Sequence, residues 1–251
     1  MDPRLSVVVM AAGKGTRMNN PSIAKVMYTI NDRPLVEWVV DLAARLDSSR
    51  TVVVVGWQKE SVIAHLAATH PSATCVEQNP QLGTGHAVMQ AEVALREFSG
   101  DVLVLSGDVP MLTVGTTRAL IDTHRAAGVA ATVLTAVLDD ATGYGRILRD
   151  RPGGAVTGIV EQKDATPEQR AIREINTGIY VFDASRLFEG LRHITTENAQ
   201  HEYYLTDVFR YFWRNELPVA AVVADDPLEV GGINTPAQLE EARRILVGRG
   251  S

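Results

Sequence analysis

A glycine-rich, basic loop follows the first apolar run of the sequence and is the first place where chemistry is expected. Residues 7–18 read VVVMAAGKGTRM, so the apolar run is followed by Gly13, Gly15 and Arg17. The third glycine of the dinucleotide fingerprint GxGxxG is missing, and the spacing of the phosphate loop GxxxxGK[ST] is not met either. Small residues let backbone N–H groups approach an anion closely, while Arg17 and Lys25 supply positive charge. The loop predicts either a phosphate site or an ordinary strand–helix turn with basic surface side chains.

A carboxylate stands at the end of another apolar run. Asp108 closes the segment VLVLSGD, at the carboxyl end of an expected strand, where open α/β sheets bind ligands. Such an oxygen ligand suits Mg²⁺, which takes one or two protein oxygens together with phosphate and water. The alternative is a solvated aspartate in the turn before Pro110. No Ser-His-Asp or Cys-His arrangement stands out, so the sequence does not indicate a protein nucleophile.

Strands and helices that alternate along the chain are expected to position these residues. Apolar runs rich in β-branched residues predict strands at 6–10, 51–55, 74–77, 102–105, 130–135, 156–161, 177–182 and 219–223. Apolar residues at helical spacing predict helices at 34–46, 59–68, 86–98 and 114–127, and a last helix at about 235–247, with Asn234 or Thr235 as its N-cap. This order indicates an α/β fold with a mixed, mainly parallel sheet flanked by helices.

The second half of the chain has a different order of expected elements. Strands near 130–137, 144–149 and 156–161 have no long helix between them, which favours antiparallel or mixed pairing. The sequence RPGG at 151–154 is typical of a hairpin turn. No repeat, low-complexity segment or linker interrupts the chain, so we expect a single domain over 1–251.

Composition excludes several classes of function. The 251 residues carry a net charge of −6, which argues against non-specific nucleic-acid binding, although local basic residues can still form a site for small anions. A single cysteine, Cys75, excludes an internal disulfide framework. No apolar stretch approaches the roughly 18 to 20 residues of a membrane span, and the first apolar run is too short for a signal peptide. These features favour the cytoplasm, with no membrane partner; they do not define the oligomeric state.

Seven segments together resemble one enzyme family. The segment MAAGKGTRM, followed by Lys25, is similar to the signature of sugar-phosphate nucleotidyltransferases. Six further segments resemble the uridyltransferase domains of its bacterial N-acetylglucosamine-1-phosphate uridyltransferases: QLGTGHA (81–87), GDVP (107–110), TGYGRI (142–147), GIVEQKDAT (158–166), EINTGIY (174–180) and EYYLTD (202–207). They occur in the family's order between about residues 5 and 246, which makes coincidence an unsatisfactory explanation.

The resemblance implies a fold, a reaction and a cofactor. The fold is the Rossmann-like nucleotide-diphospho-sugar transferase fold, with a nucleotide-binding half at about 1–112 and a sugar-binding half at about 113–235. In the implied reaction, an oxygen of N-acetylglucosamine-1-phosphate attacks the α-phosphorus of UTP with the help of Mg²⁺, and pyrophosphate leaves. Such transfers depend mainly on positioning and charge neutralisation. The expected partners are small molecules, a nucleoside triphosphate and a sugar-1-phosphate, and the product would supply cell-wall or surface-polysaccharide precursors.

The resemblance also assigns site residues. Arg17 and Lys25 are the expected catalytic cations. The expected nucleotide-binding residues are Met10, Ala11, Ala12, Gly13, Gly15, Thr16, Gln78, Gln81, Gly83, Thr84, Ser106 and Gly107. The expected sugar-binding residues are Gly145, Glu161, Asn176, Tyr203 and Thr206, and the expected metal ligands are Asp108 and Asn234. Gln78 and Gln81 suit the uracil edge because each amide both donates and accepts. For Asn234 the alternative is helix capping, and for His86 we expect a structural role.

Two departures from the family pattern leave alternatives open. Ala24 replaces the usual proline before Lys25, and Gly231 stands where the family carries a glutamate. The alternatives are the same chemistry on another sugar-1-phosphate or triphosphate, a transferase for an alcohol phosphate or molybdopterin, or a nucleotide-sugar binding module without catalysis. The hexapeptide repeats of the acetyltransferase domain found in the bifunctional enzymes are missing, so we expect no acetyl transfer by this chain.

Overall fold

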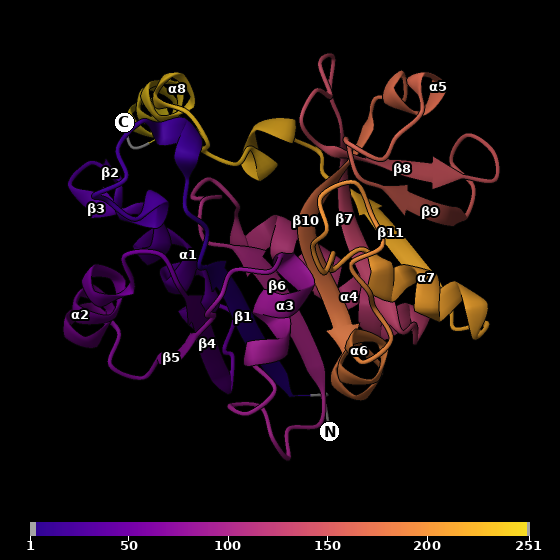
Figure 1. Ribbon diagram of the computed structural model, residues 1–251, viewed down its shortest axis with the longest axis horizontal. Helices are drawn as coiled ribbons and strands as arrows, with labels where there is room; N and C mark the ends of the chain where they lie inside the picture. Colours follow the sequence, from indigo (N-terminus) through magenta and orange to yellow (C-terminus); the bar gives the residue numbers. More distant parts are fainter. Residues whose placement is uncertain (1–3, 250–251) are drawn as a thin grey trace.

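A nine-stranded mixed sheet runs through the computed structural model, which describes residues 4–249 (Figure 1). The strand order is β11-β7-β10-β6-β1-β4-β5, and β8 joins β9 to β10. The strands are β1 (Leu5–Ala11), β4 (Arg50–Val55), β5 (Thr74–Glu77), β6 (Asp101–Ser106), β7 (Ala131–Val137), β8 (Gly145–Arg149), β9 (Val156–Val160), β10 (Glu174–Asp183) and β11 (Val219–Val223). β1 is parallel to β4 and β6, whereas β10 is antiparallel to β6, β7 and β8. The predicted mixed, mainly parallel α/β sheet is confirmed.

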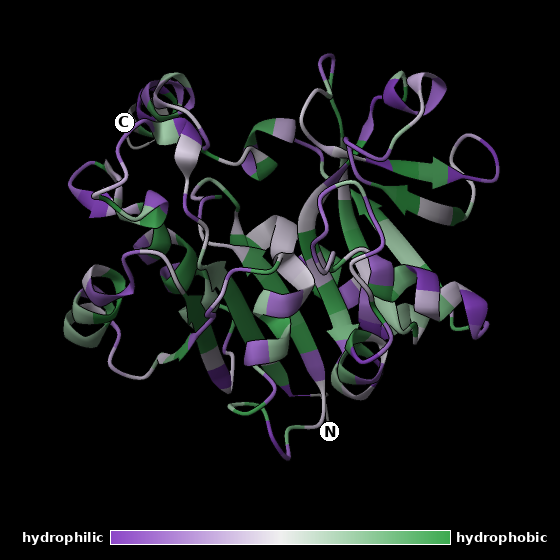
Figure 2. Cartoon of the chain, in the orientation of Figure 1, coloured by the Kyte–Doolittle hydropathy of each residue, from purple (hydrophilic) through white to green (hydrophobic). Residues whose placement is uncertain are grey.

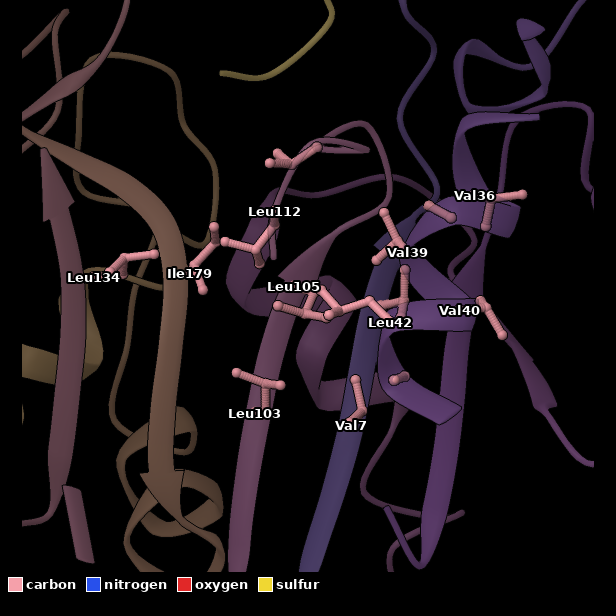
Figure 3. Packing of buried hydrophobic residues seen from close by; sticks show 14 of the residues in the cluster. Val7, Val36, Val39, Val40, Leu42, Leu103, Leu105, Leu112, Leu134 and Ile179 are labelled. Atoms are coloured by element: carbon pink, nitrogen blue, oxygen red, sulfur yellow. The ribbon is translucent and has the colours of Figure 1, made fainter. Parts of the chain in front are cut away.

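Alternate residues of the central strands build two cores, one on each face of the sheet. Val7 and Val9 of β1 pack into one core with Leu103 and Leu105 of β6, while Val8 points to the other. Figure 3 shows Leu105 beside Leu42 of α1 (Leu35–Ala44), and Figure 2 shows the central hydrophobic strands with helices around them. Burial on both faces explains why these strands are continuously apolar rather than alternating.

Helices cover both faces of the sheet. The first core is closed by α1 (Leu35–Ala44), α2 (Lys59–Thr69) and α4 (Val114–Ala127), and the second by α3 (Thr84–Gln90), α6 (Ala184–Leu191) and α7 (Asp207–Arg214). The prediction for 114–127 matches α4, but the helix expected at 86–98 is wrong in its bounds. The α-helix begins two residues earlier and ends at Gln90, because from Ala91 onward the turns are closed mainly by i→i+3 hydrogen bonds.

The remaining elements are short apart from the last helix, which packs against the N-terminal half. They are η1 (Thr16–Met18), η2 (Lys25–Met27), β2 (Thr29–Ile30), β3 (Arg33–Pro34), α5 (Pro167–Arg170), η3 (Pro227–Val230) and α8 (Pro236–Arg249). α8 lies beside β2 (Figure 1), where Arg243 Nη2 donates to Thr29 O at 2.8 Å. Thr235 Oγ1 accepts from Gln238 N at 3.3 Å, so Thr235, and not Asn234, provides the N-terminal side-chain cap. Within residues 4–249, every helix is too short or too polar to cross a membrane.

Candidate active site

A cavity of 500 Å³ opens where β1, β5 and β6 end. All of the expected nucleotide-binding residues except Gly107 line it, as do Lys25 and Asp108. Gly107 lies against the end of β1, where its N–H donates to Met10 O at 2.9 Å and holds the ends of β1 and β6 together. Parallel strands therefore bring the glycine loop (residues 13–17), the glutamine loop (residues 78–83) and Asp108 to the carboxyl edge of the sheet, which is where such sheets bind ligands.

The glycine loop brings the backbone very close to Lys25. Gly15 has a φ of 59°, the left-handed conformation in which glycine is least strained. A Cβ on Gly15 would lie 2.5 Å from Cβ of Lys25, so any side chain there would push one of the two segments away. Gly15 thus sets the position of the lysine.

Gly15→Ala is expected to lower kcat/KM by about tenfold or more, because a displacement of about 1 Å at a positioned group is costly in a reaction that depends on orientation. Gly153→Ala is the matched control, since Gly153 also has a positive φ of 70° but its Cβ would meet nothing within 4 Å. Steady-state kinetics and the Tm of both variants separate backbone strain from displacement of Lys25. An equal loss of activity in both variants would contradict this account.

Four polar side chains converge beside the cavity. Lys25 Nζ forms an ion pair with Asp108 Oδ2 and also donates to Asn234 Oδ1 at 3.1 Å, and Arg17 Nη2 donates to the same Asn234 oxygen at 2.8 Å. Asn234 Nδ2 donates to Gly232 O at 3.1 Å, which turns the amide so that its oxygen faces the cations. Because Thr235 caps the helix, the Asn234 side chain is available for this cluster.

The oxygens of this cluster fit a divalent ion that is shared with phosphate. Among residues 4–249, no three or more His, Cys, Asp or Glu side chains gather in a way that could hold a metal by themselves. Asp108 and Asn234 direct one carboxylate and one amide oxygen at the same Lys25 ammonium group. The positively charged ammonium group of Lys25 therefore contacts both oxygens in this structure. Two protein oxygens match the preference of Mg²⁺ for a small protein contribution completed by water and phosphate oxygens.

The glutamine loop is held by its own side chains. Gln78 is buried and its Nε2 donates to Gly83 O at 2.9 Å and contacts His86 Nδ1 at 3.2 Å, while Gln81 Nε2 donates to Gln78 O at 3.1 Å. Burial lowers the pKa of His86, which favours the neutral ring. His86 lies in the first turn of α3 and contacts Gln78 without lining the cavity.

A second cavity of 190 Å³ adjoins the first, and Met10, Thr84 and Ser106 line both. Four expected sugar-binding residues line the second cavity: Gly145, Glu161, Asn176 and Thr206. A Cβ on Gly145 would lie 3.3 Å from both Asn176 Cβ and Glu161 Oε2, so a larger residue would fill this space. Tyr203 lines neither cavity; its carbonyl accepts from Gly85 N at 2.8 Å and its ring lies 6.2 Å from that of His86.

Glu161 supplies a carboxyl group to the lining of the second cavity. Burial raises its pKa, and the negative charges of Asp164 and Asp207 add to the rise, while the hydrogen bond from Thr206 Oγ1 at 2.9 Å opposes it. The site therefore holds a hydrogen-bonding carboxyl group whose charge is penalised by its surroundings.

The structure adds residues to the two cavities that the sequence did not single out. Lys14 lines the larger cavity, with Nζ 5.4 Å from the ring centre of Trp57. Tyr144 and Tyr180 line the smaller one. Burial raises the pKa of Tyr144, and the negative charge of Asp108 adds to the rise, while a hydrogen bond to the Gly232 backbone opposes it. The aromatic residue inside TGYGRI was a usable signal for Tyr144. Tyr180 closes the family-like segment EINTGIY, but it was not singled out because a tyrosine in an apolar strand is usually a core residue.

Comparison with known proteins identifies the family. Residues 6–241 match the family model described as nucleotidyl transferase. Over 245 residues the chain is 49% identical to "Bifunctional protein GlmU" of Streptomyces coelicolor, and over 241 residues it is 46% identical to that of Geobacter metallireducens. The matches cover 97% and 96% of this chain but 51% and 50% of the relatives, so the chain spans about half of their length.

Solved structures share the fold at low identity. A UDP-glucose pyrophosphorylase complexed with UDP-glucose superimposes with a TM-score of 0.77 at 17% identity, over 98% of this chain and 99% of that one. A putative glucose-1-phosphate thymidylyltransferase of Bacillus anthracis gives a TM-score of 0.74, also at 17% identity, over 96% and 94% of the two chains. With the family match over residues 6–241, the chain belongs to the nucleotidyl transferase family.

Proposed function

We propose that this chain transfers the uridylyl group of UTP to N-acetylglucosamine-1-phosphate and releases pyrophosphate. The observation that carries the proposal is the junction of two cavities: Ser106 lines both, and Asp108, two residues later, lies beside Lys25 in the larger one. A triphosphate in the larger cavity and a sugar phosphate in the smaller one would bring their phosphates together at this junction. The relatives with 46–49% identity carry the name of a bifunctional enzyme, of which this chain spans half.

In the proposed reaction, a phosphate oxygen of the sugar-1-phosphate forms a bond with the α-phosphorus, and the bond to the pyrophosphate oxygen breaks. Both substrates are polyanions, so the chief tasks of the protein are orientation and charge neutralisation. Arg17 and Lys25 supply fixed positive charge, and backbone N–H groups of the glycine loop are available to the phosphates. Gln78 and Gln81 are proposed to contact the uracil. Glu161 is proposed to accept a hydrogen bond from a sugar hydroxyl, and Asn176 to donate one to the sugar.

Mg²⁺ is the proposed cofactor, held by Asp108 and Asn234. When bound, it would neutralise phosphate charge as the α-phosphorus accepts the incoming oxygen. Lys25 contacts both ligand oxygens in this structure, so binding of the ion requires the ammonium group to leave them.

A pyrophosphate-release assay tests the proposal. Several nucleoside triphosphates are paired with several sugar-1-phosphates, with Mg²⁺ or with EDTA. We expect UTP with N-acetylglucosamine-1-phosphate to give the highest kcat/KM, and chelation to abolish turnover because the phosphate charge is then unneutralised. A different best pair would overturn the substrate assignment. Absence of turnover with every pair would favour a nucleotide-sugar binding module.

A further inference from the structure

An irregularity in β10 brings together two side chains that a regular strand would hold apart. Asn176 is paired with Thr135 of β7, whereas Tyr180 is paired with Val133, so β10 advances four residues while β7 advances two. Four residues of regular strand span about 13 Å, yet Asn176 Nδ2 donates to the hydroxyl oxygen of Tyr180 at 2.8 Å. Gly178, with a φ of 79°, permits the bend between them.

Side-chain hydrogen bonds stabilise this bulge. Thr177 Oγ1 donates to Leu134 O at 2.7 Å and accepts from Ile179 N at 3.3 Å, and Gly178 N donates to Asn176 Oδ1 at 3.3 Å. Both ends of the Asn176 amide therefore have a defined partner: its oxygen faces a backbone donor, and its nitrogen faces Tyr180. The amide is held in one of its two possible orientations.

The Tyr180 hydroxyl is fixed by its surroundings. The residue is 2% exposed, and its ring packs at 5.5 Å from Phe182 and 5.3 Å from Phe209, measured between ring centres. Burial raises the pKa of the phenol far above its usual value, and the nearby charge of Glu161 adds to this, so the hydroxyl keeps its proton. Within the described part of the chain, the hydrogen bond of this hydroxyl is the one that it accepts from Asn176.

We propose that Tyr180 is a positioning residue for sugar recognition, acting by holding the Asn176 amide in a single orientation in the smaller cavity. The inference rests on the proposed sugar-binding role of Asn176. One amide N–H is occupied by Tyr180, which leaves the second N–H for the sugar. Without the hydroxyl, Asn176 Nδ2 loses its buried hydrogen-bond acceptor. The side chain is then free to change its orientation and has to be ordered again each time a sugar binds, which lowers the affinity.

Tyr180→Phe tests this inference, because it removes one oxygen and keeps the ring. We expect titration calorimetry to show UDP-N-acetylglucosamine binding weakened by about tenfold, with UDP binding changed by less than about twofold, since loss of one buried hydrogen bond has this magnitude. Steady-state kinetics should show a similar rise in KM for the sugar-1-phosphate, with kcat and the KM for UTP little changed. A general structural defect would instead lower the affinities for UDP-N-acetylglucosamine and for UDP alike.

Two further variants make the test specific. Tyr204→Phe is the matched control, because Tyr204 is also buried and its hydroxyl also has a side-chain partner, Asp164 Oδ2 at 3.1 Å, but it does not line the sugar cavity. This control should bind both ligands as the wild type does. In an Asn176→Ala background, Tyr180→Phe should have no further effect on UDP-N-acetylglucosamine binding, because its effect passes through the amide. Additive effects, or unchanged sugar-nucleotide binding by Tyr180→Phe alone, would overturn the inference.

The wild-type measurements keep this inference separate from the proposed function. If the wild type prefers another sugar nucleotide, the proposed substrate is wrong, and the same comparison with the preferred ligand still decides the role of Tyr180. If the wild type binds UDP-N-acetylglucosamine and Tyr180→Phe binds it equally well, the positioning role alone is wrong. If the wild type binds no sugar nucleotide, both proposals are wrong.

Discussion

Asp108→Asn is expected to lower kcat/KM by about a thousandfold, the size of effect seen when a group that stabilises transition-state charge is removed. The Asp108 side chain is 12% exposed and pairs with Lys25, whose side chain is 17% exposed. The substitution keeps the shape but removes the negative charge. The proposed metal then loses its one anionic protein ligand, and Lys25 loses its counter-ion in a largely buried place.

Asp139→Asn is the control for this loss of charge. Asp139 is 99% exposed and pairs with Arg173 on the surface, where an ion pair contributes about 0–1 kcal/mol to stability. It should retain wild-type kinetics. Pyrophosphate release at several Mg²⁺ concentrations provides the readout, with the Tm as a check on folding. Near-normal turnover by a folded Asp108→Asn enzyme would refute the role of this carboxylate.

Lys25→Gln is expected to lower kcat/KM by about a hundred- to a thousandfold, because the positive charge at the reacting phosphates is lost. The same substitution should strengthen the binding of a metal ion, although it lowers activity. Lys25 Nζ lies on Asp108 Oδ2 and Asn234 Oδ1, so the lysine competes with a metal for both oxygens. Removing the ammonium group should therefore tighten the binding of Mn²⁺ to the protein without nucleotide.

Electron paramagnetic resonance of free Mn²⁺ and steady-state kinetics measure these two effects separately. Lys59→Gln is the control, since Lys59 pairs with Glu77 and lies outside the lining of both cavities. It should change neither quantity. Weaker Mn²⁺ binding by Lys25→Gln than by the wild type would show that the lysine supports the metal site instead of competing for it.

Much of the local structure was predictable from short stretches of sequence. The strands at 74–77 and 219–223 and the helix at 114–127 match the structure at both ends. In each, the pattern of apolar residues agrees with what the sheet or helix buries. Besides the short elements β2, β3 and α5, this kind of prediction missed α6, α7 and the full length of β10. In α7, Val208, Phe209 and Phe212 have helical spacing, but the helix is only eight residues long and the signal is correspondingly short.

The candidate site divides in the same way. Residue types and local motifs predicted the glycine loop and Asp108 as site elements, because each follows an apolar strand and the two strands are parallel neighbours. The glutamine loop was predicted only through the family resemblance. The family resemblance extended the set to the second cavity. For Asn234 the sequence supported both capping and metal binding, and the neighbouring Thr235 turned out to provide the cap.

By itself, the sequence determined the α/β class, the mixed sheet and the chemical groups available at the strand ends, because these depend on periodicity and residue type over a few positions. Tertiary structure alone decided which groups meet. Lys25 and Asp108 are 83 positions apart, and Arg17 and Asn234 are 217 apart. Their contacts depend on the order of the strands and on the packing of α8, which follows Asn234 in the chain, beside β2. Likewise, the Asn176–Tyr180 contact depends on a bulge set by pairing with β7. Periodicity within a segment carries no information about these long-range pairings.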